Sequence, residues 1–146
     1  MPGRVEAIRI APKHEQLPEP VETVEVTGEG LTGDRYFSRG DITLVEEEAL
    51  AAFTEETGIP LSHAEIRRQV LTSGIRLNEL VDKRFRVGGV EAVGIEWCEP
   101  CNHIQTLTYP GVLRGMVHRA GLRADIVESG TISVGDEVDQ VRDAAA

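Results

Sequence analysis

Short apolar runs, rich in β-branched residues and separated by glycine, extend along most of the chain. They predict strands at residues 21–26, 85–87, 90–95, 122–127 and 131–138. Gly88-Gly89 joins two of these runs, and glycine adopts positive φ without a Cβ penalty, so a tight hairpin is expected there. In residues 90–95 the apolar side chains fall on both faces, which is typical of a strand covered on both sides. The pattern predicts a mainly β fold, with a barrel wall that carries helices outside it.

A 3.6-residue periodicity is clearest at residues 46–57, where Ala49, Leu50 and Phe53 share one face. Acidic residues fill its first turn, where they complement the helix dipole, and Gly58 with Pro60 ends the helix. Shorter helical patterns cover residues 77–84 and 111–120. Residues 12–20 and the tail 142–146 are expected to be flexible. These elements predict a single domain over residues 1–146, with a core at about 20–138 and short peripheral helices.

Composition and charge narrow the class of protein. The chain has 146 residues, 40% of them hydrophobic, and lacks the run of about 18 apolar residues that a membrane span requires. Its net charge of -10 argues against general nucleic-acid binding, because phosphate contacts need a basic face. No apolar secretory region follows the N-terminus, which predicts a cytoplasmic protein. Arginines still gather at residues 67–68 and 114–123, so an anionic small-molecule ligand stays open.

The sharpest chemical feature is the segment Trp97-Cys98-Glu99-Pro100-Cys101-Asn102-His103, which follows a predicted strand. A disulfide between cysteines three positions apart would close a very small loop and restrict the unfolded chain little, so we expect the thiols to have a chemical role. If Pro100 is the first helical residue, Cys101 lies in the first turn, where the positive end of the helix dipole favours the thiolate. The negative charge of Glu99 opposes that effect, and the sequence alone leaves the direction of the net pKa shift of Cys101 open.

This segment has four interpretations. The cysteines can pack as small hydrophobes, form a dithiol redox centre like the Trp-Cys-Gly-Pro-Cys site of thioredoxins, bind zinc together with His103, or leave Cys101 as a single working thiol. A thioredoxin site begins a long helix, whereas Tyr109-Pro110-Gly111 breaks this one within about two turns. A closed zinc site needs four ligands, and the sequence has no second ligand cluster. The pattern favours the single thiol at Cys101.

Ordered motifs over roughly residues 28–138 resemble the MOSC domain family. In chain order they are Gly30-Leu31-Thr32-Gly33-Asp34-Arg35, Ile66-Arg67-Arg68-Gln69-Val70 with Gly74-Ile75, Leu80-Val81 to Phe85-Arg86-Val87-Gly88, Cys98-Glu99-Pro100-Cys101, Pro110-Gly111-Val112-Leu113-Arg114, and Gly130-Thr131-Ile132 to Gly135-Asp136-Glu137-Val138. The chain departs from the family pattern at Gln69, where asparagine is usual, and at Tyr36, where histidine is frequent. The motifs fill most of the sequence, as is expected of the stand-alone type.

The resemblance implies a closed, pyruvate-kinase-like β-barrel that binds the molybdenum cofactor (molybdopterin) or a related sulfur species. It implies that Cys101, the cysteine of Glu-Pro-Cys, is the functional thiol, either as a persulfide sulfur carrier or as a molybdenum ligand. It also implies pyridoxal phosphate binding as a family-level property, and a cysteine desulfurase or a redox protein as partner. A molybdenum cofactor-dependent oxidoreductase, a sulfur transferase and a partner-binding barrel without catalysis all stay open.

The matched residues supply candidates for the rest of the site. Because molybdopterin carries a phosphate, a pocket for it needs permanently charged bidentate donors, and Arg67, Arg68 and Arg114 are the candidates. Further candidate cofactor-binding residues are Asp34, Asn102 and His103. Asp34 has an equal alternative role in a turn, where its carboxylate bonds its own backbone. His103 is less well placed relative to Cys101, because residues two apart on a helix point away from one another.

Overall fold

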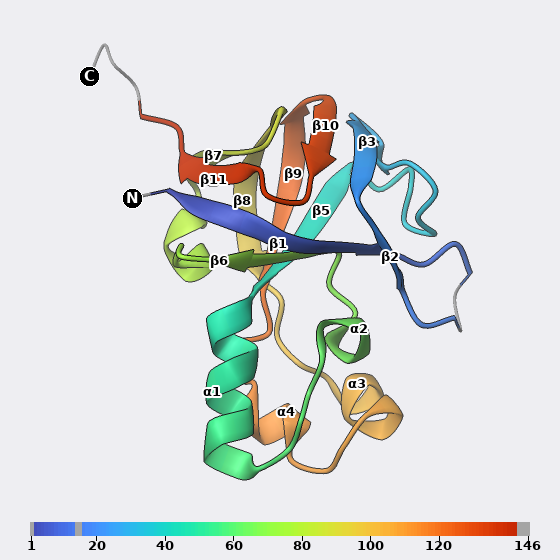
Figure 1. Ribbon diagram of the computed structural model, residues 1–146, viewed down its shortest axis with the longest axis vertical. Coiled ribbons are helices and arrows are strands. Elements are labelled where there is room, and N and C mark those ends of the chain that lie inside the picture. The colour runs from blue at the N-terminus through green and yellow to red at the C-terminus, as the bar shows by residue number, and fades with distance from the viewer. Residues whose placement is uncertain (1, 14–15, 143–146) are drawn as a thin grey trace.

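Seven strands close a barrel in the computed structural model, which describes residues 2–13 and 16–142 (Figure 1). The strand order is β11, β7, β8, β9, β5, β6 and β1, and β1 pairs again with β11. Only β5 and β6 run parallel among these described neighbours. The strand bounds are β1 Gly3–Ile10, β5 Asp41–Glu46, β6 Val70–Ser73, β7 Arg84–Val87, β8 Val90–Trp97, β9 Leu122–Glu128 and β11 Glu137–Gln140. The mainly β, closed barrel expected from the sequence is confirmed.

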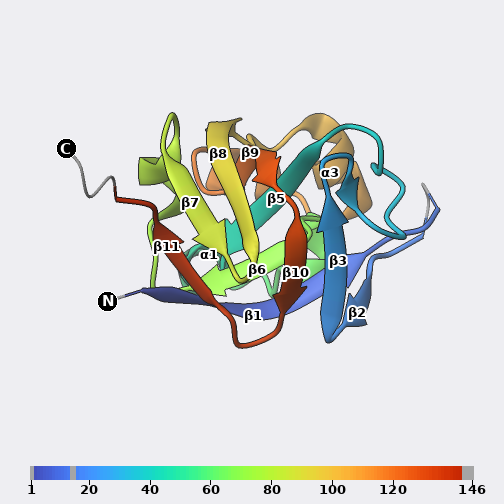
Figure 2. The same ribbon diagram turned by 90° about the horizontal axis from the view of Figure 1, so that it is seen from above.

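A second sheet covers one end of the barrel. It consists of β10 (Gly130–Ser133), β3 (Thr23–Thr27) and β4 (Gly30–Leu31), while β2 (Glu19–Val21) extends the barrel sheet beside β1. Figure 2 shows β10 and β3 side by side at the end away from the helices. Leu31 and Ile132 of this sheet are fully buried in the same apolar cluster as Phe85 of the barrel wall. The second sheet therefore closes the barrel core.

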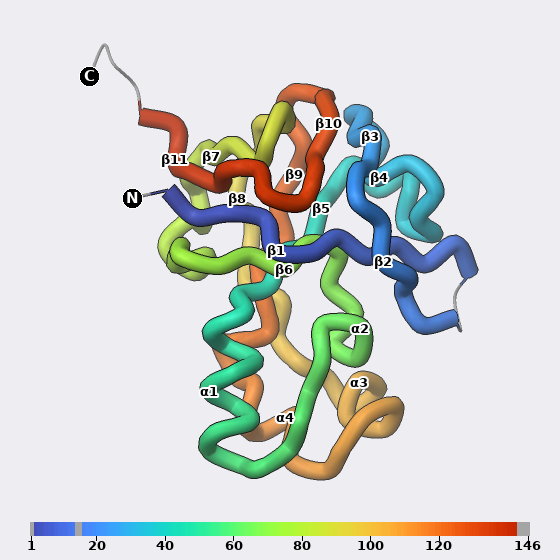
Figure 3. The backbone as a smooth tube through the Cα atoms, viewed as in Figure 1, coloured from blue at the N-terminus to red at the C-terminus, as the bar shows by residue number. Residues whose placement is uncertain are grey.

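The helices gather at the opposite end of the barrel (Figures 1 and 3). They are α1 (Glu47–Thr57), α2 (His63–Ile66), α3 (Asn102–Leu107) and α4 (Val112–Gly115), and a 3-10 turn, η1, lies at Leu77–Leu80. Their apolar side chains form a second buried cluster around Phe53 and Met116. The short peripheral helices expected from the sequence are confirmed, and their apolar faces pack against one another and against Val45 at the end of β5.

None of the helices in the described part of the chain is long and apolar enough to cross a membrane.

Two predicted strands are each divided in the structure. The run at residues 21–26 is interrupted at Glu22, where the chain leaves β2 in the barrel sheet and enters β3 in the second sheet. The run at residues 131–138 turns at Gly135, which has φ +95°, between β10 and β11. Apolar residues stand on both sides of each corner, so the apolar runs did not locate the breaks.

The helix predictions differ in outcome. The prediction at residues 46–57 is confirmed by α1, which ends at the left-handed Gly58. The prediction at 111–120 is too long, because α4 ends at Gly115 and His118 adopts φ +63°. The prediction at 77–84 is also too long, because Val81 is already extended and β7 begins at Arg84.

The hairpin between β7 and β8 is confirmed, since Val87 lies opposite Val90. Gly88 has φ +57°, and a Cβ there would come within 2.3 Å of Asp136 Oδ2, so this turn favours glycine. Strand β8 is buried on both faces at its start, as predicted, and this includes the charged Glu91.

Three sequence expectations concern the chain ends. Strand β1 buries Val5 and Ile8, so apolar packing begins before the expected core at about residue 20. Residues 14–15 of the predicted loop lie outside the described residues, and so do residues 143–146 of the expected tail.

Candidate functional site

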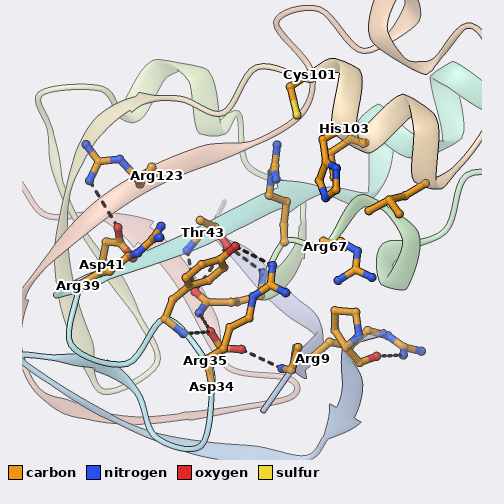
Figure 4. A pocket seen from close by; sticks show the side chains of 17 residues that line it. Arg9, Asp34, Arg35, Arg39, Asp41, Thr43, Arg67, Cys101, His103 and Arg123 are labelled. Atoms are coloured by element: carbon orange, nitrogen blue, oxygen red, sulfur yellow. Dashed lines mark hydrogen bonds and ion pairs between the residues drawn. The ribbon is translucent and has the colours of Figure 1, made fainter. Parts of the chain in front are cut away.

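A cavity of about 480 Å³ lies between the barrel and α3 (Figure 4). Its lining comes from β1, the loop after β4, β5, the turn after α2, α3 and β9. Among the described residues, two acidic side chains line it, Asp34 and Asp41. The arginines that line it are Arg9, Arg35, Arg39, Arg67, Arg68 and Arg123. Six arginines against two aspartates leave four positive charges in excess, within a chain whose net charge is -10.

The floor of the cavity is a hydrogen-bonded cluster around Asp34. Its Oδ1 accepts from the Ala11 N–H (2.8 Å), and its Oδ2 accepts from Gln69 Nε2 (2.9 Å) and the Tyr36 N–H (3.2 Å). Gln69 Oε1 in turn accepts from the Thr43 N–H (2.9 Å). The bond to Tyr36 is the turn contact that the sequence suggested. Three donors of the chain thus engage the Asp34 carboxylate, and it fastens the loop after β4 to the barrel.

Arg67 and Arg68 reach the cavity from the turn that ends α2. Arg67 adopts φ +63°, a left-handed conformation that costs a non-glycine residue on the order of 1 kcal/mol. Its Nη1 donates to the Gln16 carbonyl (3.2 Å), and Arg68 Nε donates to the Ala120 carbonyl (2.7 Å). The strained turn and these bonds hold both predicted arginines at the cavity.

Behind this turn, His63 is buried and contacts the Arg68 carbonyl through Nε2 (2.7 Å). Burial lowers the pKa of His63 to about 4, and the hydrogen bond to Arg68 only partly offsets this. The ring is therefore neutral at pH 7, with its proton on Nε2 to donate to that carbonyl.

Cys101 lies exposed at the rim of the cavity, immediately before α3. Figure 4 shows its sulfur directed into the cavity, beside His103. Cys101 has extended dihedrals (φ −132°, ψ 169°) and the helix begins at Asn102, so the expectation that Pro100 is the first helical residue is wrong. The segment stays extended beyond β8 because the Cys98 N–H still bonds the Gly121 carbonyl (2.8 Å).

Cys98 occupies a different environment from Cys101. It is half-buried and does not line the cavity. Burial raises the pKa of its thiol, an effect that the nearby Arg68 guanidinium partly offsets, so Cys98 is a neutral thiol at pH 7. The residues between the two cysteines form neither helix nor turn, whereas in the dithiol interpretation the cysteines open a helix. The structure thus supports the single-thiol interpretation over the dithiol one.

Glu99 turns away from the cavity. Its Oε1 accepts from the His118 N–H (2.6 Å) and its Oε2 pairs with His118 Nδ1 (2.7 Å). The His118 ring also packs edge-on against Trp97, with 5.0 Å between ring centroids. Glu99 therefore clamps the cysteine-bearing segment to the loop after α4, rather than facing Cys101 across the cavity.

The remaining predicted residues are only partly brought together. His103 lines the cavity from α3, whereas Asn102 and Arg114 are exposed and do not line it. Arg114 lies outside because α4 packs Val112 and Met116 inward, which directs the intervening residue to solvent. Within the described residues, no group of three or more His, Cys, Asp and Glu side chains could hold a metal ion, so the zinc interpretation is not supported.

Several cavity residues escaped the sequence motifs. Arg9 comes from β1, which contributed no motif, and Arg39 follows the Gly33-Asp34-Arg35 motif by four residues. Arg123 was part of the noted arginine gathering, but pairing with Glu96 and Asp41 ties it to the cavity edge. Burial raises the pKa of Asp41, although Arg123 and Arg39 counteract the effect. Only the barrel topology brings these arginines together.

Comparison with known proteins agrees with this architecture. The chain is similar to the YUAD protein from Bacillus subtilis (TM-score 0.86, 16% identity, 98% of both chains covered). It is also similar to YiiM from Geobacillus stearothermophilus (TM-score 0.77, 14% identity, 97% of this chain and 76% of that chain). YiiM from Escherichia coli gives a TM-score of 0.69 at 16% identity over 97% of this chain and 71% of that chain. At these identities the likeness shows the fold alone.

A search of curated proteins found no match to the chain. The MOSC domain, in contrast, matches residues 32–139, which include the loop after β4, the Arg67-Arg68 turn and the Cys101 segment. The match covers well over half of the 146 residues. This chain belongs to the MOSC domain family.

Proposed function

We propose that this protein binds the molybdenum cofactor, or a related anionic sulfur species, with Cys101 as sulfur carrier or molybdenum ligand. One observation carries the proposal: an exposed thiol is directed into a cavity that is lined by six arginines. The thiol supplies a soft sulfur donor, and guanidinium groups are suited to phosphate and other oxyanions.

The residues of the cavity fit such a group. Its volume of about 480 Å³ is typical of small-molecule pockets. Its positive charge, inside a protein with net charge -10, would attract an anionic ligand to this face. When bound, the cofactor would supply molybdenum redox chemistry.

The side chains of the cavity would make different kinds of contact with the ligand. Arg67 and Arg68 are held by a strained turn and offer planar donors to a phosphate. Ile104 and Leu107 of α3 provide an apolar wall, and His103 stands beside Cys101 as a further hydrogen-bonding group. Asp34 and Gln69 would form the floor beneath the ligand. They would not bind its charged groups, because their polar atoms already form hydrogen bonds within the protein.

The exposed position of Cys101 also suits sulfur transfer from a partner protein. The Cys101 thiolate would attack the outer sulfur of a donor persulfide, the donor S–S bond would break, and the donor would leave as a thiolate. Cys101 would then hold the persulfide at the cavity rim. A cysteine desulfurase is the class of protein that could supply it.

Native mass spectrometry of freshly purified protein tests the proposal. We expect the mass of molybdopterin on the intact protein, or one added sulfur on the peptide that contains Cys101. Cys101→Ala should abolish either signal, and Cys98→Ala is the matched control that should retain it. If both cysteine variants lose the signal equally, the single-thiol assignment is wrong.

A second matched pair tests the cavity. Arg67→Gln should lower cofactor retention, whereas Arg114→Gln, outside the cavity, should not. If neither a cofactor nor added sulfur is found on the wild-type protein, and cofactor added in vitro does not bind, a partner-binding barrel without catalysis becomes the better account.

A further inference from the structure

Tyr36 is a cavity residue that the proposed function leaves unused. Its ring lies against two guanidinium groups, with Arg35 Cζ at 4.5 Å and Arg39 Cζ at 4.2 Å from the ring centroid. Its hydroxyl oxygen accepts from Arg35 Nη2 (2.6 Å). All three residues line the cavity. One aromatic side chain therefore organises two of the six arginines.

The backbone around Tyr36 is fixed on both sides. Its N–H donates to Asp34 Oδ2 (3.2 Å), and its carbonyl accepts from the Arg39 N–H (3.1 Å). The same loop turns through Ser38, which has φ +107°, an uncommon conformation for a residue other than glycine. The Ser38 N–H donates to the Glu29 carbonyl (2.8 Å), which holds that turn in place. The ring thus has a defined position toward the cavity.

Stacking on an aromatic face orients a guanidinium group, and for Arg35 the bond from Nη2 to the Tyr36 hydroxyl adds to this effect. Contact with the ring therefore fixes the positions of two positive charges in the cavity lining. Figure 4 shows Arg39 on one side of the cavity and Arg67 with Arg9 on the other. Arg39 and Arg67 therefore offer cationic donors on opposite sides of the cavity, and Figure 4 shows Arg35 between them.

We propose that Tyr36 is a positioning residue that holds Arg35 and Arg39 against its ring as anion-binding groups in addition to Arg67, so that the cavity selects ligands with two anionic groups over ligands with one. This inference rests on the proposed function, because it assumes that the cavity takes an anionic ligand. It adds a ligand class, dianionic two-headed molecules, and the residue that sets the preference.

Isothermal titration calorimetry with inorganic pyrophosphate and inorganic phosphate, at one ionic strength, tests it. The wild-type protein should bind pyrophosphate roughly tenfold more tightly than phosphate, because the second phosphate group of pyrophosphate would also contact an arginine. Tyr36→Leu, which removes the ring, should bring the ratio of the two affinities close to one. Tyr36→Phe, which keeps the ring and loses only the hydroxyl bond, should restore most of the ratio.

Two controls separate positioning from general damage. Phe37→Leu alters a neighbouring half-buried ring that does not line the cavity, and it should leave the ratio unchanged. Arg39→Gln should lower the ratio as Tyr36→Leu does. A wild-type protein that binds both anions, with the same ratio in Tyr36→Leu, overturns this inference alone. A wild-type protein that binds neither anion contradicts the proposed anionic ligand itself.

Discussion

Asp34→Asn tests whether the floor of the cavity is structural. The carboxylate accepts three hydrogen bonds, one on Oδ1 from Ala11 and two on Oδ2 from Gln69 and Tyr36. An amide has the same shape but only one acceptor oxygen. If that oxygen keeps the two donors on the Oδ2 side, the amide NH2 faces the buried Ala11 N–H, and two donors oppose each other.

The cost follows from these contacts. Loss of one hydrogen bond to a charged acceptor, with a buried N–H left unsatisfied, costs about 3 kcal/mol of the free energy of unfolding. For a domain of this size that is a fall of roughly 6–12 °C in Tm. Thermal unfolding followed by circular dichroism measures it, and the exposed Asp139→Asn is the matched control, which should change Tm little.

The comparison with ligand retention decides the role of Asp34. We expect the loss of stability to appear in protein without ligand. A Tm within about 2 °C of wild type, together with lost cofactor retention, would mean that the carboxylate contacts the ligand directly and that its structural assignment is wrong.

Two further predictions concern the scaffold. The pKa of His63 is lowered from 6.5 to about 4 in the folded protein. The contribution of the neutral ring to the free energy of unfolding is therefore fully present above pH 6.5 and is lost as the pH falls toward 4. Between pH 7 and pH 5 this amounts to a loss of about 2 kcal/mol, and urea unfolding of His63→Gln should show a correspondingly weaker pH dependence; an unchanged slope would contradict it. Gly115→Ala should destabilise by about 1–3 kcal/mol although alanine favours helices, because its Cβ would lie 2.4 Å from the buried Phe53 ring; a rise in Tm would contradict that packing.

The sequence was sufficient for the features that depend on local pattern. Apolar runs and glycine turns predicted a β-barrel, and α1 was recognised because its periodicity and its terminal Gly58 agree. The corners at Glu22 and Gly135 were missed, because apolar residues continue on both sides of each corner where the chain crosses from one sheet to the other. The length of α4 was overestimated, because Arg119 continues the helical spacing while the backbone at His118 has already left the helix.

The site was only partly predictable for a related reason. Motif residues such as Cys101, Arg67 and Arg68 were found because they stand in ordered segments. Arg9 and Arg39 join them only through pairings between strands far apart in sequence, for which a single sequence gives no signal. Arg114 was selected because it belongs to one of the family motifs, but it lies on the side of α4 that faces away from the cavity.

The rate of Cys101 alkylation tests the central claim most directly, which is that this thiol and the cavity arginines form one site. Iodoacetamide modification of both cysteines, followed by peptide mass spectrometry, is measured with and without inorganic pyrophosphate. The account predicts that Cys101 reacts faster than the half-buried Cys98, that pyrophosphate slows only Cys101, and that Arg67→Gln weakens this protection. Equal rates for the two thiols, or a Cys101 rate that saturating pyrophosphate leaves unchanged, would contradict it.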